Sequence, residues 1–263
     1  MQILAHNSNQ KIFKQMKAFR EKPFRFKQFE VYQEKSLLKV NTDGCLLAAV
    51  VAHDISLSKA KTVKPNTILD IGTGTGVIAL MLAQAFTAEI DAVEIDNSSA
   101  KQAKYNFEIS PWANRLHCYH DDIIHFHGSS VEEYQLIVSN PPFFDKAKKS
   151  PYKHKNLSKH NEKLPQDALV NAIAKLLAKE GICYIILPII ESEKFTLRLS
   201  KAQLYLNRKI LVKPISYKPP HRVILKISKA QTTLTNEIIT IRNKYEDFDE
   251  TYISLLSAYY LAF

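Results

Sequence analysis

The sequence has few cysteines and no long apolar run. Its three cysteines, Cys45, Cys118 and Cys183, are far apart and odd in number. Neither a CxxC pair nor a Cys/His ligand spacing occurs, so we expect no disulfide framework and interpret the thiols as reduced. The longest apolar runs fall well short of the roughly 18 residues that a membrane-spanning helix needs. The N-terminal lysines are not followed by the unbroken apolar segment of a signal peptide. The sequence therefore predicts a soluble, cytoplasmic protein.

A closed set of metal ligands is also missing. His120, Asp121, Asp122, His125 and His127 lie close together in the sequence. A structural zinc site needs four ligands at defined spacings, and this group does not have such a pattern. We therefore interpret these side chains as surface groups near the end of a strand, and we expect no metal.

The net charge of +10 is concentrated in two segments. Residues 11–39 contain nine Lys or Arg and three Glu, and residues 145–163 contain seven Lys, one Asp and one Glu. The rest of the chain is close to neutral. Two such patches are consistent with solvated surfaces and equally with the binding of a polyanion such as RNA. Charge alone leaves both interpretations open.

From residue 67 onward, short apolar runs alternate with helical patterns. This alternation predicts an α/β fold with a mostly parallel, seven-stranded sheet and helices on both faces. Only a short loop separates the last two strands of this core, so they should pair antiparallel, with an antiparallel strand at the sheet edge. Asn97 should cap a helix, and Gly181 should end the helix that Pro165 opens. The predicted strands are 67–71, 89–95, 116–119, 134–138, 182–187, 209–212 and 223–227, with a further strand at 237–242, and the predicted helices are 77–85, 97–109, 165–179, 191–203 and 250–261.

Aromatic and basic residues alternate before this core. Phe24, Phe26 and Phe29 flank Arg25 and Lys27, and a second apolar stretch follows. This pattern predicts a β-hairpin with its turn near residues 33–35. We therefore expect a basic N-terminal segment with a hairpin over residues 1–44, packed on a second domain that spans residues 45–263.

A glycine-rich turn follows the first core strand. It reads Asp70-Ile71-Gly72-Thr73-Gly74-Thr75-Gly76, and glycine allows the backbone to turn tightly and approach a ligand. Glu94 ends the second strand, where a carboxylate can accept hydrogen bonds from ribose hydroxyls. A dinucleotide-binding loop would have its third glycine one residue later, where Val77 stands. The pattern instead resembles the first motif of class I S-adenosylmethionine-dependent methyltransferases, which implies S-adenosylmethionine as the cofactor and a Rossmann-like fold.

The stretch Asn140-Pro141-Pro142-Phe143 follows the fourth strand, at the same predicted sheet edge. It resembles the (D/N/S)-P-P-(F/Y/W) motif of methyltransferases that act on an exocyclic or amide nitrogen. The lone pair of such a nitrogen is delocalised, so two acceptors that hold its N–H groups align it for attack on a methyl group. Asn140 and the carbonyl of Pro141 are the candidate acceptors, and Phe143 is the candidate stacking surface for an extruded base.

Further stretches extend the resemblance along nearly the whole chain. They are Phe26-Lys27-Gln28-Phe29, Val40-Asn41-Thr42-Asp43-Gly44, Ser110-Pro111-Trp112-Ala113 and Tyr259-Tyr260-Leu261-Ala262-Phe263, besides the two motifs above. With them the chain is similar to the tRNA(Val) adenine-N6-methyltransferase family, which modifies adenosine 37 beside the anticodon. The resemblance implies that Asp70, Gly72 and Gly74 hold the methionine end of the cofactor near Thr42 and Asp43, and that Gly76 and Asn140 also bind the cofactor. It further implies that Glu94 binds the ribose and that Ile123 lies beside the adenine ring. The adenine amino group is assigned to Asp122, with the neighbouring Asp121 as the alternative.

The second basic segment begins directly after the catalytic motif, so it must emerge beside the mouth of the site. Tyr152, between Pro151 and Lys153, adds an aromatic surface for a base. With tRNA as partner of a monomeric enzyme, we predict RNA contacts from Lys27, Lys148, Lys149, Tyr152, Lys153 and Lys155.

Three other functions are compatible with parts of this pattern. A release-factor glutamine methyltransferase also uses an Asn-Pro-Pro motif, but its substrate would not need two basic patches. An rRNA guanine-N2-methyltransferase shares Asn-Pro-Pro-Phe, but such enzymes often contain a duplicated domain. A non-catalytic RNA-binding protein would be expected to lack an intact glycine turn or Asn140, and both are present here.

Overall fold

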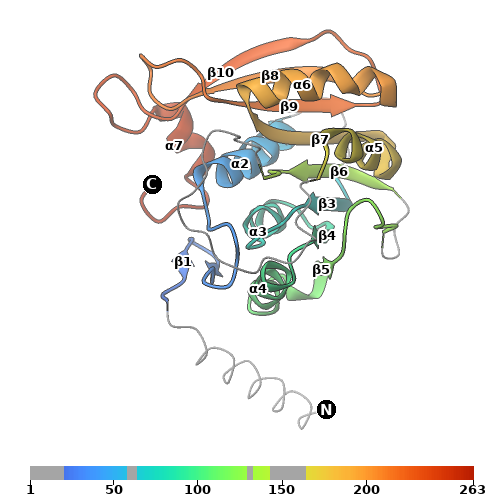
Figure 1. The fold of residues 1–263 in the computed structure, drawn as a ribbon. Coiled ribbons are helices and arrows are strands. Elements are labelled where there is room, and N and C mark those ends of the chain that lie inside the picture. The colour runs from blue at the N-terminus through green and yellow to red at the C-terminus, as the bar shows by residue number, and fades with distance from the viewer. Residues whose placement is uncertain (1–20, 58–63, 129–132, 143–163) are drawn as a thin grey trace, which may run out of the picture.

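The computed structural model describes residues 21–57, 64–128, 133–142 and 164–263. The strands of its main sheet are β3 (Thr67–Ile71), β4 (Glu89–Glu94), β5 (Leu116–His120), β6 (Tyr134–Ser139), β7 (Leu177–Pro188), β8 (Tyr205–Lys213), β9 (Arg222–Ser228) and β10 (Thr235–Thr240). They form one eight-stranded sheet in the order β10-β8-β9-β7-β6-β3-β4-β5 (Figure 1). The predicted α/β fold and the additional strand near residue 237 are confirmed.

The one reversed strand lies inside the sheet. β9 pairs antiparallel with β7 and with β8, whereas all other neighbouring pairs of this sheet are parallel. The predicted antiparallel pairing of the last two core strands is therefore correct. The predicted edge position of the reversed strand is wrong, because β8 and β10 continue the sheet beyond β9, and β10, predicted as a further strand, brings the seven predicted core strands to eight. As a result, β9 begins at the edge where the parallel strands end.

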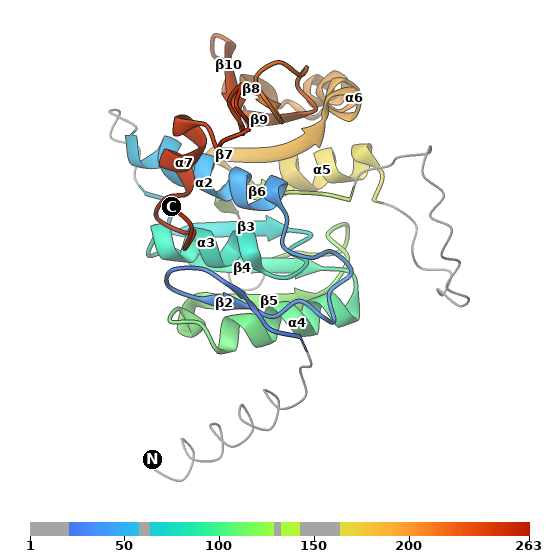
Figure 2. The ribbon, with the colours of Figure 1, turned by 90° about the vertical axis from the view of Figure 1, so that its left-hand side faces the viewer.

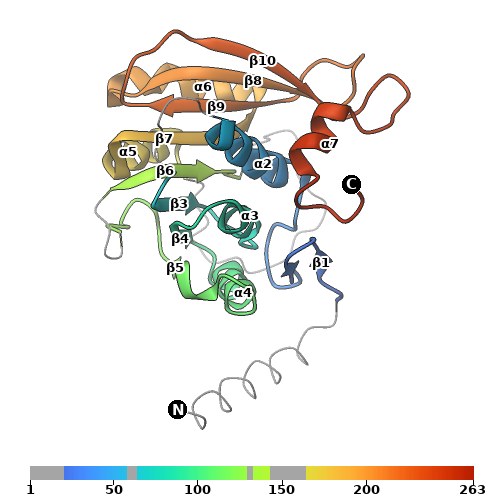
Figure 3. The ribbon, with the colours of Figure 1, turned by 180° about the vertical axis from the view of Figure 1, so that it is seen from behind.

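Helices cover both faces of the sheet. On one face lie α2 (Thr42–Leu57), α3 (Val77–Ala85), α4 (Asn97–Glu108) and α7 (Glu250–Leu256), and on the other lie α5 (Gln166–Leu176) and α6 (Ile189–Leu199) (Figures 1 and 3). Short 3-10 turns occupy Ala113–Arg115 and Ser200–Ala202. Two separate clusters of buried apolar side chains fill the space between the sheet and each helical layer. Within the described ranges, every helix is too short or too polar to cross a membrane.

The sequence patterns did not reveal α2. Every residue from Gly44 to Ala52 is buried, so the central stretch of this helix is apolar all round and has no polar face to create a periodic pattern. It packs against α3 and α7 and reaches β7. α2 also crosses the predicted boundary after Gly44, and the division into two domains stays a prediction.

Several helix ends differ from those predicted: α6 ends at Leu199 and α7 at Leu256, each some residues earlier than expected. α5 ends at Leu176, and the chain continues directly into β7, so Gly181 lies inside a strand rather than after a helix. The β6–β7 pairing shifts there, and a Cβ on Gly181 would lie 2.9 Å from the carbonyl oxygen of Tyr134. Close backbone approach therefore explains this glycine. At α4, the cap is Asp96, whose carboxylate accepts a hydrogen bond from the Ser99 N–H at 2.8 Å, and Asn97 is already helical.

The N-terminal hairpin is present, but its turn comes earlier than predicted. β1 (Phe24–Arg25) pairs antiparallel with β2 (Glu30–Val31), and the Phe26 N–H donates to the Phe29 carbonyl at 2.9 Å across the turn. The following segment lies along α4 (Figure 2). There the Tyr32 N–H donates to Asn106 and the Leu37 N–H to the Ser99 hydroxyl. This segment then enters α2 at the sheet edge where the parallel strands end.

Candidate active site

The glycine turn between β3 and α3 lies at that edge. Gly72, Gly74 and Gly76 have φ angles of 73°, 57° and 83°, a region that favours glycine. The Gly72 N–H donates to the Val93 carbonyl at 2.8 Å, which fixes the turn against β4. A Cβ on Gly72 would have no other atom within 4 Å, so the turn borders open space at this residue.

Asp70 supplies a fully buried carboxylate beneath the turn. The Thr73 hydroxyl donates to its Oδ2 at 2.6 Å, while its Oδ1 has no hydrogen-bond partner among the described residues. Burial raises the pKa of Asp70 to about 7, and the bond from Thr73 opposes this shift. A buried carboxylate with one unused oxygen is suited to a cationic or hydrogen-bond-donating ligand.

Glu94 lies across the turn at the end of β4. Its carboxylate accepts hydrogen bonds from the N–H groups of Gly74 and Asp96, each at 2.9 Å. Burial is the largest cause that raises the pKa of Glu94, and these N–H groups lower it. Each oxygen still has a lone pair for a ligand hydroxyl. Ile95, the next residue, leaves 52% of its surface exposed and offers an apolar face beside this carboxylate.

Asn140 follows β6, the strand beside β3. The Ser139 hydroxyl donates to the Ile71 carbonyl at 2.9 Å and thereby joins the ends of these two strands. The Asn140 Nδ2 lies 3.5 Å from the Oδ1 of Asn41, the residue before α2. The prediction that Asn140 and the glycine turn share one edge is confirmed.

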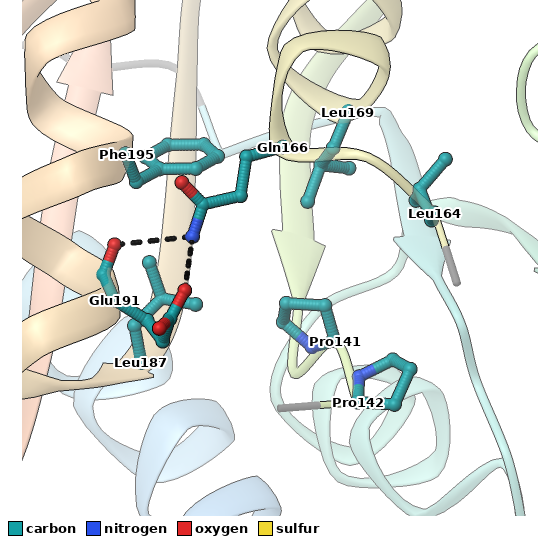
Figure 4. A pocket seen from close by; sticks show the side chains of 8 residues that line it. All are labelled: Pro141, Pro142, Leu164, Gln166, Leu169, Leu187, Glu191 and Phe195. Carbon is teal, nitrogen blue, oxygen red and sulfur yellow. Dashed lines mark hydrogen bonds between the residues drawn. The ribbon is translucent and has the colours of Figure 1, made fainter. Parts of the chain in front are cut away.

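A mainly apolar pocket lies beside the two prolines that follow Asn140 (Figure 4). Gln166 enters it from the start of α5, and its Nε2 donates to the carboxylate of Glu191 at 2.8 Å and to the Glu191 carbonyl at 3.2 Å. The pocket therefore lies between the two prolines on one side and α5 and α6 on the other. It is lined by Pro141, Pro142, Leu164, Gln166, Leu169, Leu187, Glu191 and Phe195.

The chain matches the methyltransferase small domain over residues 52–186. It is 38% identical over 241 residues to the tRNA1(Val) (adenine(37)-N6)-methyltransferase of Flavobacterium psychrophilum, covering 90% of this chain and 99% of the relative. The enzyme of the same name from Pectobacterium carotovorum is 32% identical over 260 residues, covering 98% and 99%. The chain belongs to the tRNA1(Val) (adenine(37)-N6)-methyltransferase family.

A solved structure agrees with this assignment at the level of the fold. A predicted O-methyltransferase, protein Atu636 from Agrobacterium tumefaciens, superposes with a TM-score of 0.59 at 15% identity, covering 82% of this chain and 96% of that one. The class I methyltransferase fold predicted from the glycine turn is thereby confirmed.

The family fold brings most of the predicted cofactor residues to one edge, with some differences in detail. Thr42 is exposed at the start of α2, whereas Asp43 forms an ion pair with Arg222 at 2.7 Å. Asp122 uses its Oδ1 to accept the Ile124 N–H, which leaves its Oδ2 for a ligand. Ile123, predicted beside the adenine ring, is only 6% exposed and packs in the core.

The predicted RNA contacts fall into two groups. The ammonium of Lys27 donates to the carbonyls of Ser257 and Phe263, at 2.6 and 2.8 Å, so in this structure it holds the C-terminal segment. The predicted stacking residue and the remaining predicted contacts lie outside the described residues; they are Phe143, Lys148, Lys149, Tyr152, Lys153 and Lys155.

Sequence reasoning missed three residues of this edge. Asn41, which contacts Asn140 from about 100 residues earlier, stands in a stretch that carries the family resemblance, directly before Thr42, but no role was assigned to it. Arg222 approaches the edge from about 80 residues after Asn140, a distance over which local patterns carry no information. Ile95 could have been recognised, because an apolar residue directly after the acidic end of a strand stands outside the core pattern. In the described ranges, no group of three or more His, Cys, Asp or Glu side chains is arranged to hold a metal ion.

Proposed function

We propose that this protein transfers a methyl group from S-adenosylmethionine to N6 of adenosine 37 in a valine tRNA. The observation that carries the proposal is the position of Asn140-Pro141-Pro142 at the end of β6, directly beside the glycine turn that ends β3. The names and the near full-length coverage of the relatives from Flavobacterium and Pectobacterium support the choice of substrate.

The residues at the glycine turn fit this cofactor. When bound, S-adenosylmethionine supplies an electrophilic methyl group on a positively charged sulfur. The buried carboxylate of Asp70, with its unused Oδ1, suits the charged methionine end, and the open space at Gly72 admits a ligand close to the backbone. The remaining lone pairs of Glu94 suit the ribose hydroxyls, and the Oδ2 of Asp122 suits the adenine amino group.

Asn140 and Pro141 orient the target amine. The Asn140 Oδ1 and the Pro141 carbonyl each accept one N–H of the adenine amino group, so its lone pair turns toward the methyl group. Pro141 and Pro142 fix their own φ angles, which keeps this carbonyl in place before the substrate arrives. The residues thus act by orientation, and the nitrogen loses its proton after it has been methylated. Phe143 supplies the face on which the extruded base stacks.

The basic segment at residues 145–163 supplies contacts to tRNA phosphates. Because tRNA is the substrate, the enzyme acts in the cytoplasm. A monomer suffices, because one chain provides both the cofactor residues and Asn140. The names of the relatives favour tRNA adenine over the glutamine and guanine substrates of the two alternative methyltransferases. The intact glycine turn and Asn140, brought to one sheet edge by the pairing of β3 with β6, favour an enzyme over a non-catalytic RNA-binding protein.

A methylation assay with an Asn140→Ala variant tests the proposal. Purified protein, labelled S-adenosylmethionine and a valine tRNA transcript should yield N6-methyladenosine in the digested RNA, and a transcript with guanosine at position 37 should stay unlabelled. Loss of an oriented acceptor should lower kcat by about 10² or more, while the affinity for S-adenosylhomocysteine, measured by calorimetry, stays nearly unchanged. A variant that keeps more than about a tenth of the wild-type kcat would exclude the role given to Asn140.

A further inference from the structure

Two backbone contacts fix the side-chain orientation of Asn41. Its Oδ1 accepts the Gly44 N–H at 2.9 Å in the first turn of α2, and its Nδ2 donates to the Lys39 carbonyl at 3.2 Å. A backbone N–H only donates and a backbone carbonyl only accepts. These contacts therefore decide which end of the Asn41 amide is oxygen, a choice that shape alone leaves open.

The same oxygen faces the side chain of Asn140. The Asn41 Oδ1 lies 3.5 Å from the Asn140 Nδ2, a long hydrogen bond. Turning the Asn140 amide by 180° would bring two oxygens together, each with only lone pairs to offer. The oxygen and nitrogen of an amide are nearly equal in size, so packing does little to distinguish the two orientations. The polarity of Asn41 does distinguish them.

The start of α2 is itself held in place. The Val40 N–H donates to the side chain of Gln33 at 2.9 Å, and Asp43 forms the 2.7 Å ion pair with Arg222 at the start of β9. Asn41 lies between these two anchors. It can therefore act as a fixed reference for Asn140 rather than as a second mobile side chain.

We propose that Asn41 is a positioning residue that turns the Asn140 amide with its nitrogen toward α2 and its oxygen toward the substrate. This inference rests on the proposed function, because it concerns the oxygen that accepts an N–H of the target adenine. The contact is made before substrate binds, so it lowers the cost of orientation in the reaction.

Substitutions at position 41 separate this role from helix capping. Asn41→Ser keeps a good N-cap but is too short to reach Asn140, so kcat on valine tRNA should fall by about two- to tenfold, the factor that one hydrogen bond contributes. The melting temperature and the Kd for S-adenosylhomocysteine should not change. Asn41→Asp restores an acceptor of the same length and should recover kcat. Asp249→Ser, at the N-cap of α7, is the matched control for a change of capping residue.

A double-mutant cycle completes the test. In an Asn140→Ala background there is no amide to orient, so Asn41→Ser should leave the residual rate unchanged. An equal loss in both backgrounds, or full kcat for Asn41→Ser alone, would overturn the inference while the proposed function stands. A wild-type protein that transfers no methyl group to valine tRNA would overturn the proposed function and this inference with it.

Discussion

Substitutions in the glycine turn should distinguish Gly76, which packs against the core, from Gly72, which borders the space proposed for the cofactor. Gly76 precedes α3 with φ +83°, and a Cβ there would lie 2.6 Å from Cε1 and 3.1 Å from Cζ of Phe107. Phe107 is 2% exposed, so it has little room to move. A left-handed conformation costs an L-residue about 1–2 kcal/mol, and overpacking a buried site costs about 1–3 kcal/mol more. We therefore expect Gly76→Ala to lower the free energy of unfolding by about 2–5 kcal/mol.

Gly72→Ala is the matched control, and urea denaturation measures both variants. Its φ of +73° is similar, but no atom lies within 4 Å of the new Cβ, so only the cost of about 1–2 kcal/mol for the left-handed conformation applies. The affinity for S-adenosylhomocysteine should follow the opposite order. Gly72→Ala should weaken binding more than Gly76→Ala, because a methyl group at residue 72 enters the space proposed for the cofactor. In a Phe107→Leu background, Gly76→Ala should cost less. Equal losses of stability for Gly76→Ala and Gly72→Ala would refute the argument.

Two further predictions concern charge. Because burial raises the pKa of Asp70 to about 7, the folded protein without cofactor retains a proton that the unfolded chain has lost, so stability should fall as pH rises from about 4 to about 7. Asp70→Asn should remove this slope and stabilise the cofactor-free protein more at pH 8 than at pH 5 in urea denaturation, and equal effects at both pH values would contradict the prediction. Replacing Lys148, Lys149, Lys153 and Lys155 by Ala should weaken tRNA binding and reduce the slope of log K against log salt by about 0.7–0.9 for each phosphate that a lysine no longer neutralises. Unchanged salt dependence would show that this segment does not bind phosphates.

The parts of the fold predicted well from sequence are those in which local and global preferences agree. The glycine turn, its flanking strand and α3 follow one another with clear turn chemistry and helical spacing. α2 gave no comparable pattern, since its central residues Gly44 to Ala52 are buried on all sides and have no amphipathic period. Gly181 was misleading, because the usual reason for a glycine after a helix is a cap, whereas here the reason is the nearby carbonyl of Tyr134.

The position of a candidate site residue was predictable where it depends only on the end of its own strand. Asp70, Glu94 and Asn140 all follow this rule, since parallel strands bring their carboxyl ends to one edge. The partners of these residues depend on long-range packing instead. Arg222 meets Asp43 only because β9 runs backward through the sheet, a placement that no local pattern specifies. The same holds for Lys27, whose charge suggested RNA but whose ammonium lies against the C-terminal carbonyls.

Because β9 runs opposite to its neighbours, two kinds of loop form the edge that carries Asn140. They are the turns after β3 and β4 and the loop that joins β8 to β9, and they differ in how strongly the structure constrains their sequence. The turns after β3 and β4 are constrained by tight backbone geometry and by the contacts of Asp70 and Glu94. The loop at residues 214–221 reaches the same edge from β8, and Tyr217 and Lys218 at its tip are exposed. Substitutions in that loop would alter the rim of the proposed site and leave the glycine turn untouched.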